Sequence, residues 1–524
     1  MWPGRGLGNR GEMTGPFSAF VASVPPSSPL VEPHRTTPPD GIGWVSSVDP
    51  SHPTVLGLEH ELAASLAGPS QLVGACNPAM AILQAAGVEP VSLSSAQYLG
   101  NGARLYLDSG DHPEYATPEC RTPQELVASD LAGTHYLGEV VERAEAALSA
   151  HFEVPVELSL IRHNSSPNGF SWGTHENYLV PSQCSWFDLA FGLATHLASR
   201  VCFTGAGTLI GTPAGDAGYR ISQRAPFVGR VLWASAQAPG GKPMVLGRDE
   251  PLADPARFRR LQVCCGEASV APMASLLKIG TTLVGIRLVE ARSAPSARLV
   301  DPVHALHLFG TAGDLSARAE LEDGRSVRAI DLQWMWLDAA WDFERRVGLS
   351  PDEAAVLPLW EGVLTDLEHD PAAAADRVDW LAKRRVLEHL AGDAPLQGDD
   401  ARLVMADLSY HELAPRRSIG RRLVARGHLR PVVDERAVRH FVDHPPAGTR
   451  AAVRGALVQA LQRSGRPYDI SWTTCRVHVG TVRQEVSLMD PFANRDDHAD
   501  ALLAELDRLP ATLGSFRGCA LDGA

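Results

Sequence analysis

The clearest alternation of hydrophobic and polar positions lies at residues 103–108, Ala-Arg-Leu-Tyr-Leu-Asp. Successive side chains of a strand point to opposite faces, so Arg104, Tyr106 and Asp108 share one face and apolar residues occupy the other. A cation, a phenol and a carboxylate on one strand face are compatible with a catalytic surface or with a merely solvated one.

A second alternation, at residues 54–62, predicts another strand. It places Glu59 and Glu61 on one face, with Leu58 and Leu62 on the other. The two strands therefore offer two polar faces of similar size. If they are neighbours in one sheet, their carboxylates lie close together.

Helical periodicity follows these strands. Thr122-Pro123-Gln124-Glu125 has the residues of a capping box with proline at the first helical position, which predicts the start of a long helix. A further strand is expected at 156–161, and a loop at 162–169 leads into residues 171–178. Further helices are expected at 185–201, 270–290, 328–346, 351–368 and 376–391.

The pattern divides the chain into three parts. Residues 1–50 are rich in Pro, Gly and Ser, which predicts a disordered extension. We interpret residues 51–429 as one large domain, the catalytic one. Residues 430–524 predict a small α+β domain, with a helix at 435–463, strands near 470–479 and 484–488, and a helix at 496–508.

Composition narrows the classes of protein. The 524 residues are 44% hydrophobic and 21% charged, with a formal charge of −14, so a large core and no nucleic-acid partner are expected. The densest basic positions, Arg259-Arg260 and the arginines at 416–422, are interpreted as solvated helix faces.

The eight cysteines show no zinc-ligand spacing, and Cys264-Cys265 lie in an apolar run, as core thiols do. This usage is typical of a reducing cytoplasm. The N-terminus has no apolar segment of a secretory signal, and the best membrane candidate, 187–203, is interrupted by charged residues. We therefore expect a cytoplasmic protein with no membrane partner.

Oxygen-rich side chains suggest the chemistry. Carboxylates that converge on a sheet repel one another unless a cation neutralises them, and Mg²⁺ is the usual cation for a phosphoanhydride site. The sequence has no P-loop motif. The alternative is that these groups are separate surface residues. The side chains concerned are Glu59, Glu61, Tyr106, Glu114, His175 and Glu176.

Seven segments together carry a family resemblance: GLEHEL, NGARLYLDSGDHPEYATPEC, SWGTHENYL, ISQR, RDEP, LLKIGTT and HPPAGTRAAVRG. From about residue 55 to about 500 the chain resembles the Pup ligase and Pup deamidase/depupylase family, in the carboxylate–amine ligase group. The resemblance implies an α+β fold, with a glutamine-synthetase-like antiparallel sheet cradle flanked by helices. It also implies that the small C-terminal domain contributes to a nucleotide site.

The resemblance also implies a role for seven residues. The family's magnesium ligands correspond to Glu59, Tyr106 and Glu114. Its contacts with ATP, or with ADP and phosphate, correspond to Arg104, Thr117 and Trp472. The catalytic carboxylate is Asp108, which would deprotonate a lysine amine in a ligase, or would activate water or attack an amide in a hydrolase.

Three positions depart from the family pattern. Gln262 stands where a histidine is expected, Ser269 where an asparagine is expected, and Pro226 where an aspartate is expected. An amide can hydrogen-bond a phosphate oxygen but is a poor substitute for an imidazole ligand. These departures predict an altered second half of the nucleotide and metal site, and a slow enzyme.

The branch of the family is predicted from longer stretches. The body of the sequence is similar to the depupylase, whereas the segment from Ala63 to Leu99 has the short length found in the ligase. The leading interpretation is an ATP- and Mg²⁺-dependent Pup deamidase/depupylase-like amidohydrolase, acting on Pup or a Pup-like small protein and on pupylated proteins. The alternatives are a Pup–protein ligase working through a γ-glutamyl phosphate, a diverged small-molecule enzyme, and a non-catalytic Pup-binding protein.

Overall fold

The computed structural model describes residues 52–69, 76–87, 96–108, 110–166, 169–210, 218–235, 240–248, 250–479 and 481–508. The extension predicted at residues 1–50 lies outside the described residues. From residue 47 onward the chain forms one compact unit. The division at residue 430 stays a prediction.

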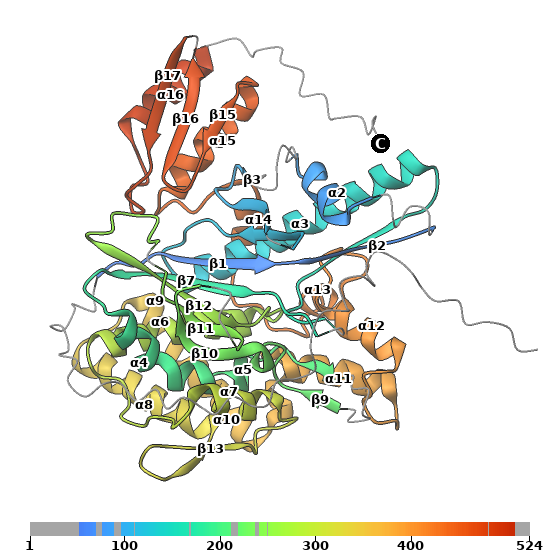
Figure 1. Cartoon of the computed structure of the whole chain (residues 1–524), viewed down its shortest axis with the longest axis vertical. Coiled ribbons are helices and arrows are strands. Elements are labelled where there is room, and N and C mark those ends of the chain that lie inside the picture. The colour runs from blue at the N-terminus through green and yellow to red at the C-terminus, as the bar shows by residue number, and fades with distance from the viewer. Residues whose placement is uncertain are drawn as a thin grey trace, which may run out of the picture. The chain divides into compact units, whose positions relative to one another are not determined.

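An eight-stranded sheet runs through the middle of this unit (Figure 1). Its spatial order is β10 (Val228–Trp233), β11 (Lys242–Leu246), β12 (Phe258–Gly266), β7 (Thr174–Pro181), β1 (Leu56–Glu61), β5 (His112–Ala116), β4 (Arg104–Asp108) and β3 (Ala96–Tyr98). The two alternating segments of the sequence are therefore β1 and β4, and β5 lies between them.

The predicted α+β class is confirmed, but the sheet is mixed rather than wholly antiparallel. Strands β10 and β11 pair in parallel, with Val228 opposite Lys242 and Trp233 opposite Leu246. A strand's alternation does not encode the direction of its neighbour.

One face of the sheet is covered by apolar helices. Leu56 and Leu58 of β1 point into this core, which contains α4 (Trp186–Ser199), α5 (Val201–Thr204), α6 (Pro272–Glu290), α8 (Ala329–Arg346) and α10 (Val356–His369). Every residue of α6 is buried. Within the described part, α6 is the one helix long and apolar enough to cross a membrane, and packing in the core accounts for its composition.

Helix α3 (Pro123–Phe152) begins where the sequence predicts. The Thr122 side chain accepts a hydrogen bond from the Glu125 amide at 3.1 Å. The reciprocal bond differs from the prediction, because the Glu125 carboxylate accepts from the amide of Arg121 at 2.8 Å. Helix α2 (Pro78–Ala85) and strands β2 (Ala63–Ala67) and β6 (Glu157–Ile161) complete the second apolar cluster around α3.

The C-terminal region differs from its prediction in one place. The helix expected at 435–463 is two helices, α14 (Glu435–Asp443) and α15 (Ala451–Ser464), with Pro445-Pro446 between them. Proline lacks the amide hydrogen that a helix interior needs, so the two prolines prevent one continuous helix. Helix α15 packs with α16 (Asp497–Arg508) on a sheet of β15 (Tyr468–Ile470), β16 (Thr474–Val479) and β17 (Val482–Ser487).

The remaining elements surround the core. They are β8 (Thr208–Ile210), β9 (Gly218–Arg220), β13 (Arg318–Glu320), β14 (Ser326–Arg328), α7 (Pro302–Thr311), α9 (Pro351–Ala354), α11 (Asp379–Ala391), α12 (Ala401–Tyr410), α13 (Ile419–Ala425) and the 3₁₀ turns η2 (Ala225–Phe227) and η3 (Pro371–Asp376).

Candidate active site

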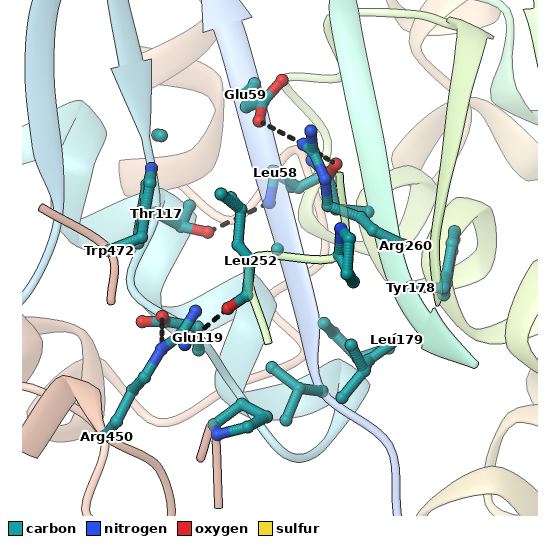
Figure 2. Close-up of a pocket in the computed structure, with 17 residues that line it drawn as sticks. Leu58, Glu59, Thr117, Glu119, Tyr178, Leu179, Leu252, Arg260, Arg450 and Trp472 are labelled. Carbon is teal, nitrogen blue, oxygen red and sulfur yellow. Dashed lines mark hydrogen bonds and ion pairs between the residues drawn. The ribbon is translucent and has the colours of Figure 1, made fainter. Parts of the chain in front are cut away.

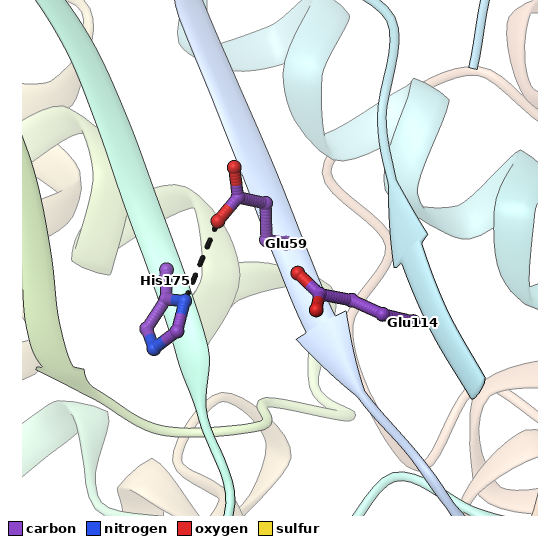
Figure 3. A group of neighbouring side chains, drawn as sticks. All are labelled: Glu59, Glu114 and His175. Carbon is purple, nitrogen blue, oxygen red and sulfur yellow. Dashed lines mark hydrogen bonds and ion pairs between the residues drawn. The ribbon is translucent and has the colours of Figure 1, made fainter. Parts of the chain in front are cut away.

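The polar faces of four neighbouring strands meet on the side of the sheet away from the apolar helices. In the strand register Glu61 of β1 lies opposite Glu114 of β5, and Glu114 lies opposite Tyr106 of β4. Glu59 lies opposite His175 of β7. Strand pairing therefore brings the two predicted polar faces together on one surface. Figure 3 shows Glu59 of this surface between His175 and Glu114.

The carboxylate of Glu59 has three side-chain partners on this surface. Its Oε2 accepts from the Gln262 amide at 2.9 Å and lies 3.4 Å from Nδ1 of His175, while Oε1 lies 3.5 Å from a guanidinium nitrogen of Arg260. Burial opposes ionisation, but the hydrogen bond from His175 and the charge of Arg260 outweigh it and lower the pKa of Glu59 to about 2. Glu59 is therefore an anion at neutral pH.

Glu114 has the opposite electrostatic situation. Burial, together with the negative charge of Glu59, raises its pKa well above the usual value. Its hydrogen-bond partner Tyr106 also has a pKa raised well above normal, by burial and by the charges of Glu114 and Glu59. Acidic groups are thus crowded on this face, and their mutual repulsion favours the protonated form of Glu114.

The donor atoms suit a divalent cation. Glu59, Glu114 and His175 each offer one ligand atom, and these atoms lie within 4.8 Å of one another (Figure 3). Glu61, Asp108 and Glu114 form a second such group. Carboxylate oxygens are preferred ligands of Mg²⁺, and a divalent cation here would remove the repulsion that raises the pKa of Glu114. The residues present therefore fit the cation that the resemblance implies.

A close approach of the backbone fixes part of this surface. The Gly173 amide donates to Glu61 Oε2 at 2.6 Å. A Cβ at residue 173 would lie 2.3 Å from Nε2 of His175, so a side chain there would displace the imidazole. The glycine before β7 thus allows both Glu61 and His175 to occupy their positions.

Arg104 and Asp108 lie at the two ends of the β4 face. The guanidinium of Arg104 is 4.1 Å from the centre of the Tyr106 ring, and its Nε is buried with no hydrogen-bond partner among the described residues. A buried donor of this kind suits an anionic ligand. Asp108 is half-buried, lies opposite His112 in the β4–β5 hairpin and shares the second carboxylate group.

A pocket adjoins Glu59 along β1 (Figure 2). Thr117, Leu252 and Trp472 are among its lining residues, and most of the lining is apolar. The Thr117 hydroxyl accepts from the Leu58 amide at 3.0 Å, which fixes this side of the pocket to β1. An apolar pocket with an aromatic wall and carboxylates at one end suits a nucleotide whose phosphates reach a metal.

The structure places the seven predicted residues in two adjoining groups. Glu59, Arg104, Tyr106, Asp108 and Glu114 share the polar sheet face. Thr117 and Trp472 line the pocket, to which Glu59 also contributes. Their individual roles remain predictions.

Three contributors were not assigned roles from sequence. Glu61 and His175 were named among the candidate side chains but were given no individual role. The interpretation of Arg259-Arg260 as a solvated helix face is wrong, because both arginines lie on β12. Arg260 reaches Glu59 and lines the pocket.

Two of the departures from the family pattern, Gln262 and Ser269, lie in different parts of the structure. Gln262 bonds Glu59 and belongs to the site. Ser269 is buried in the core, where its hydroxyl accepts from Lys278 at 3.3 Å and its carbonyl from Arg162 at 2.8 Å. Arg162 pairs with Asp130, which bonds His60 on the opposite face of β1 from Glu59. Ser269 therefore contacts the core beneath β1 rather than the polar face, and its effect on the nucleotide and metal site stays a prediction.

A mixed sheet with carboxylates on its exposed face, beside an apolar pocket, defines an enzyme-type site in an α+β fold. Residues 69–476 match the family model described as Pup-ligase protein, and the chain belongs to this family.

Named relatives agree with this assignment. The Pup--protein ligase of Acidimicrobium ferrooxidans is 34% identical over 415 residues, which cover 79% of this chain and 90% of the relative. The Pup--protein ligase of Pseudarthrobacter chlorophenolicus is 35% identical over 416 residues, covering 78% and 90%.

Two solved structures are also similar. The complex between Prokaryotic Ubiquitin-like Protein Pup and its Ligase PafA aligns with a TM-score of 0.78 and 28% identity, over 88% of this chain and 94% of that one. The Pup ligase PafA in complex with ADP aligns with a TM-score of 0.73 and 30% identity, over 81% and 91%. These relatives are ligases, which favours the ligase over the deamidase/depupylase predicted as the leading activity.

Proposed function

We propose that this protein is an ATP-dependent Pup–protein ligase. It would join the γ-carboxylate of a C-terminal glutamate of Pup, or of a Pup-like small protein, to the side-chain amine of a lysine on a target protein. The observation that carries the proposal is the similarity, along most of the chain, to ligases solved with Pup and with ADP. The short segment between β1 and β4 agrees with it.

The nucleotide would lie with its base in the pocket and its phosphates toward Glu59. Trp472 and Thr117 line the pocket, and Arg104 offers a buried Nε without a partner among the described residues. Mg²⁺ bound among Glu59, Glu114 and Tyr106 would neutralise charge on the phosphates. His175 and Glu61 supply additional donor atoms beside this set.

The chemistry proceeds in two transfers. The γ-carboxylate of Pup attacks the terminal phosphorus of ATP, forming a γ-glutamyl phosphate and releasing ADP. The lysine amine then attacks the acyl carbon, phosphate leaves with the bonding electrons, and Asp108 accepts the amine proton. Asp108 suits this task because it is half-buried on the same strand face as Arg104 and Tyr106.

Product analysis tests this activity directly. The full chain is incubated with ATP, Mg²⁺, a lysine-containing acceptor protein and a Pup-like peptide ending in glutamate. We expect ADP release in step with a conjugate whose mass equals the two reactants less one water. A matched peptide ending in glutamine should give neither product.

Two other outcomes would overturn the proposal. Ammonia release from the glutamine peptide without conjugate formation would identify the deamidase instead. Binding of the glutamate peptide without ADP release would identify a non-catalytic Pup-binding protein.

A further inference from the structure

Arg454 is a fully buried arginine that connects α15 to the sheet. Its Nη1 donates to Glu119 Oε1 at 3.0 Å, and its Nη2 also pairs with Glu119. Nη2 and Nε donate to the carbonyl of Gly102, at 2.9 and 3.3 Å. One side chain thus joins α15 to both the segment before β4 and the segment after β5.

The same guanidinium lies beside two aromatic rings. Its central carbon is 4.7 Å from the centre of the Trp472 ring and 5.3 Å from that of the Tyr98 ring. The two rings meet edge to face, with centres 5.2 Å apart. A planar guanidinium in this position restrains Trp472 by cation–π attraction, and Glu119 and Gly102 restrain the guanidinium in turn.

Trp472 forms a wall of the pocket, as do Glu119 and Arg450. Arg450 donates to Glu119 at 2.7 Å and to the carbonyls of Leu252 and Leu488 at 2.6 and 2.8 Å. The wall is therefore held in place by buried polar contacts between the sheet and the C-terminal segment. Arg454 itself does not line the pocket.

We propose that Arg454 is a positioning residue for the nucleotide pocket, acting through Trp472 and Glu119. This inference rests on the proposed function, because it takes the ligand of the pocket to be ATP. Binding of ATP and docking of the C-terminal segment are then coupled: each stabilises the other by the same free energy. Arg454 provides that coupling without touching the ligand.

Lysine at position 454 tests the proposal with least disturbance. Arg454→Lys keeps a positive charge for Glu119 but loses the planar group that packs beside Trp472. We expect faster hydrogen exchange across residues 468–479 without nucleotide and a roughly tenfold weaker Kd for a non-hydrolysable ATP analogue. The KM for ATP should rise similarly, while kcat at saturating ATP stays nearly unchanged.

Arg476→Lys is the matched control. Arg476 lies on β16 of the same segment and pairs with Glu485 at the surface, away from the pocket. Its replacement should change neither exchange nor nucleotide affinity. If Arg454→Lys does not fold, Tyr98→Leu removes the second ring and should loosen Trp472 in the same direction, with a smaller effect on the Kd.

The outcomes separate this inference from the proposed function. If the unaltered chain binds no ATP analogue, the proposed function fails and the inference fails with it. If the unaltered chain binds and the variant that folds binds equally well, the inference alone is wrong. Weaker binding without faster exchange across 468–479 would also overturn it, because Arg454 would then act directly on the ligand.

Discussion

Glu59 and Glu119 have similar pKa values but very different surroundings. The pKa is lowered to about 2 in both, against the effect of burial. Glu119 is held by two arginines, at 2.7 Å from Arg450 and in a close two-pronged pair with Arg454. Glu59 has one arginine at 3.5 Å, and Glu114 beside it carries a raised pKa.

This difference shows that a perturbed pKa does not by itself identify a functional group. The carboxylate of Glu119 is neutralised by its protein partners, as in a structural ion pair. On the Glu59 surface, burial and the charge of Glu59 instead raise the pKa of Glu114, and a divalent cation would relieve that repulsion. Four mutational predictions test this contrast.

The largest effect is expected at Asp108, which lies on the Glu59 surface in one group with Glu61 and Glu114. Asp108→Asn keeps the shape but cannot accept the amine proton, so conjugate formation should fall about a thousandfold in single-turnover assays. The affinity for ATP should stay unchanged. Asp342→Asn, at an exposed ion pair on α8, is the control. A rate near that of the unaltered enzyme would remove Asp108 from the mechanism.

Glu119→Gln should mainly reduce stability. It leaves Arg450 and Arg454 buried without their counter-charge, so the free energy of unfolding at pH 7 should fall by about 3 kcal/mol in urea titrations. Glu435→Gln, at an exposed pair with Arg439, should have almost no effect.

The pH dependence of this loss has a definite sign. Because folding lowers the pKa of Glu119 from 4.5 to about 2, its ionisation stabilises the fold above pH 4.5. That contribution is lost as the pH falls through about 2. The stability difference between the unaltered chain and Glu119→Gln should therefore shrink from pH 4.5 downward; a constant difference would contradict the assignment.

Glu59→Gln should differ from Glu119→Gln in the property that it affects. We expect little loss of stability and a clear loss of metal binding. Removing the charge also relieves the repulsion on Glu114, which offsets the lost contacts to His175 and Arg260. The affinity for Mg²⁺, measured by calorimetry with nucleotide present, should fall by at least about tenfold. Glu485→Gln on β17 is the control. Unchanged Mg²⁺ affinity would show that Glu59 is not a ligand.

The smallest effect is expected at Gln262, whose amide donates to Glu59. Gln262→His supplies an imidazole that can donate to a phosphate oxygen, so conjugate formation should accelerate a few-fold. The affinity for Mg²⁺, which prefers oxygen ligands, should stay nearly unchanged. Gln397→His, at an exposed position, is the control. No gain in the rate of conjugate formation would show that the amide does not slow the enzyme.

Sequence alone predicted most of the local structure that builds the site. Alternation in β1 and β4 placed Glu59, Glu61 and Arg104 on their faces correctly, because a strand has a strict period of two. The cap of α3 followed from Thr122 and Pro123. The resemblance supplied Thr117 and Trp472, whose positions beside the same pocket no local pattern indicates.

What sequence could not provide were partners distant along the chain. The contact of Arg260 with Glu59 depends on the neighbouring positions of β12, β7 and β1, which the alternation of a single strand does not specify. Glu119 could be listed among acidic residues, but its neutralisation depends on Arg450 and Arg454, more than three hundred positions away. The parallel β10–β11 pair was missed for a different reason, because the alternation within a strand does not specify the direction of its neighbour.

The pocket is built from both ends of the described chain, with Val55 and Pro491 both in its lining. During synthesis, the strands that carry Glu59 and Asp108 leave the ribosome long before the segment that carries Trp472. A nascent chain therefore exposes its acidic sheet face without a complete pocket until translation is nearly finished. The need for contacts between distant segments also makes this last stage of folding slow. Completion of the C-terminal segment is thus the step at which a newly made molecule closes the pocket beside Glu59.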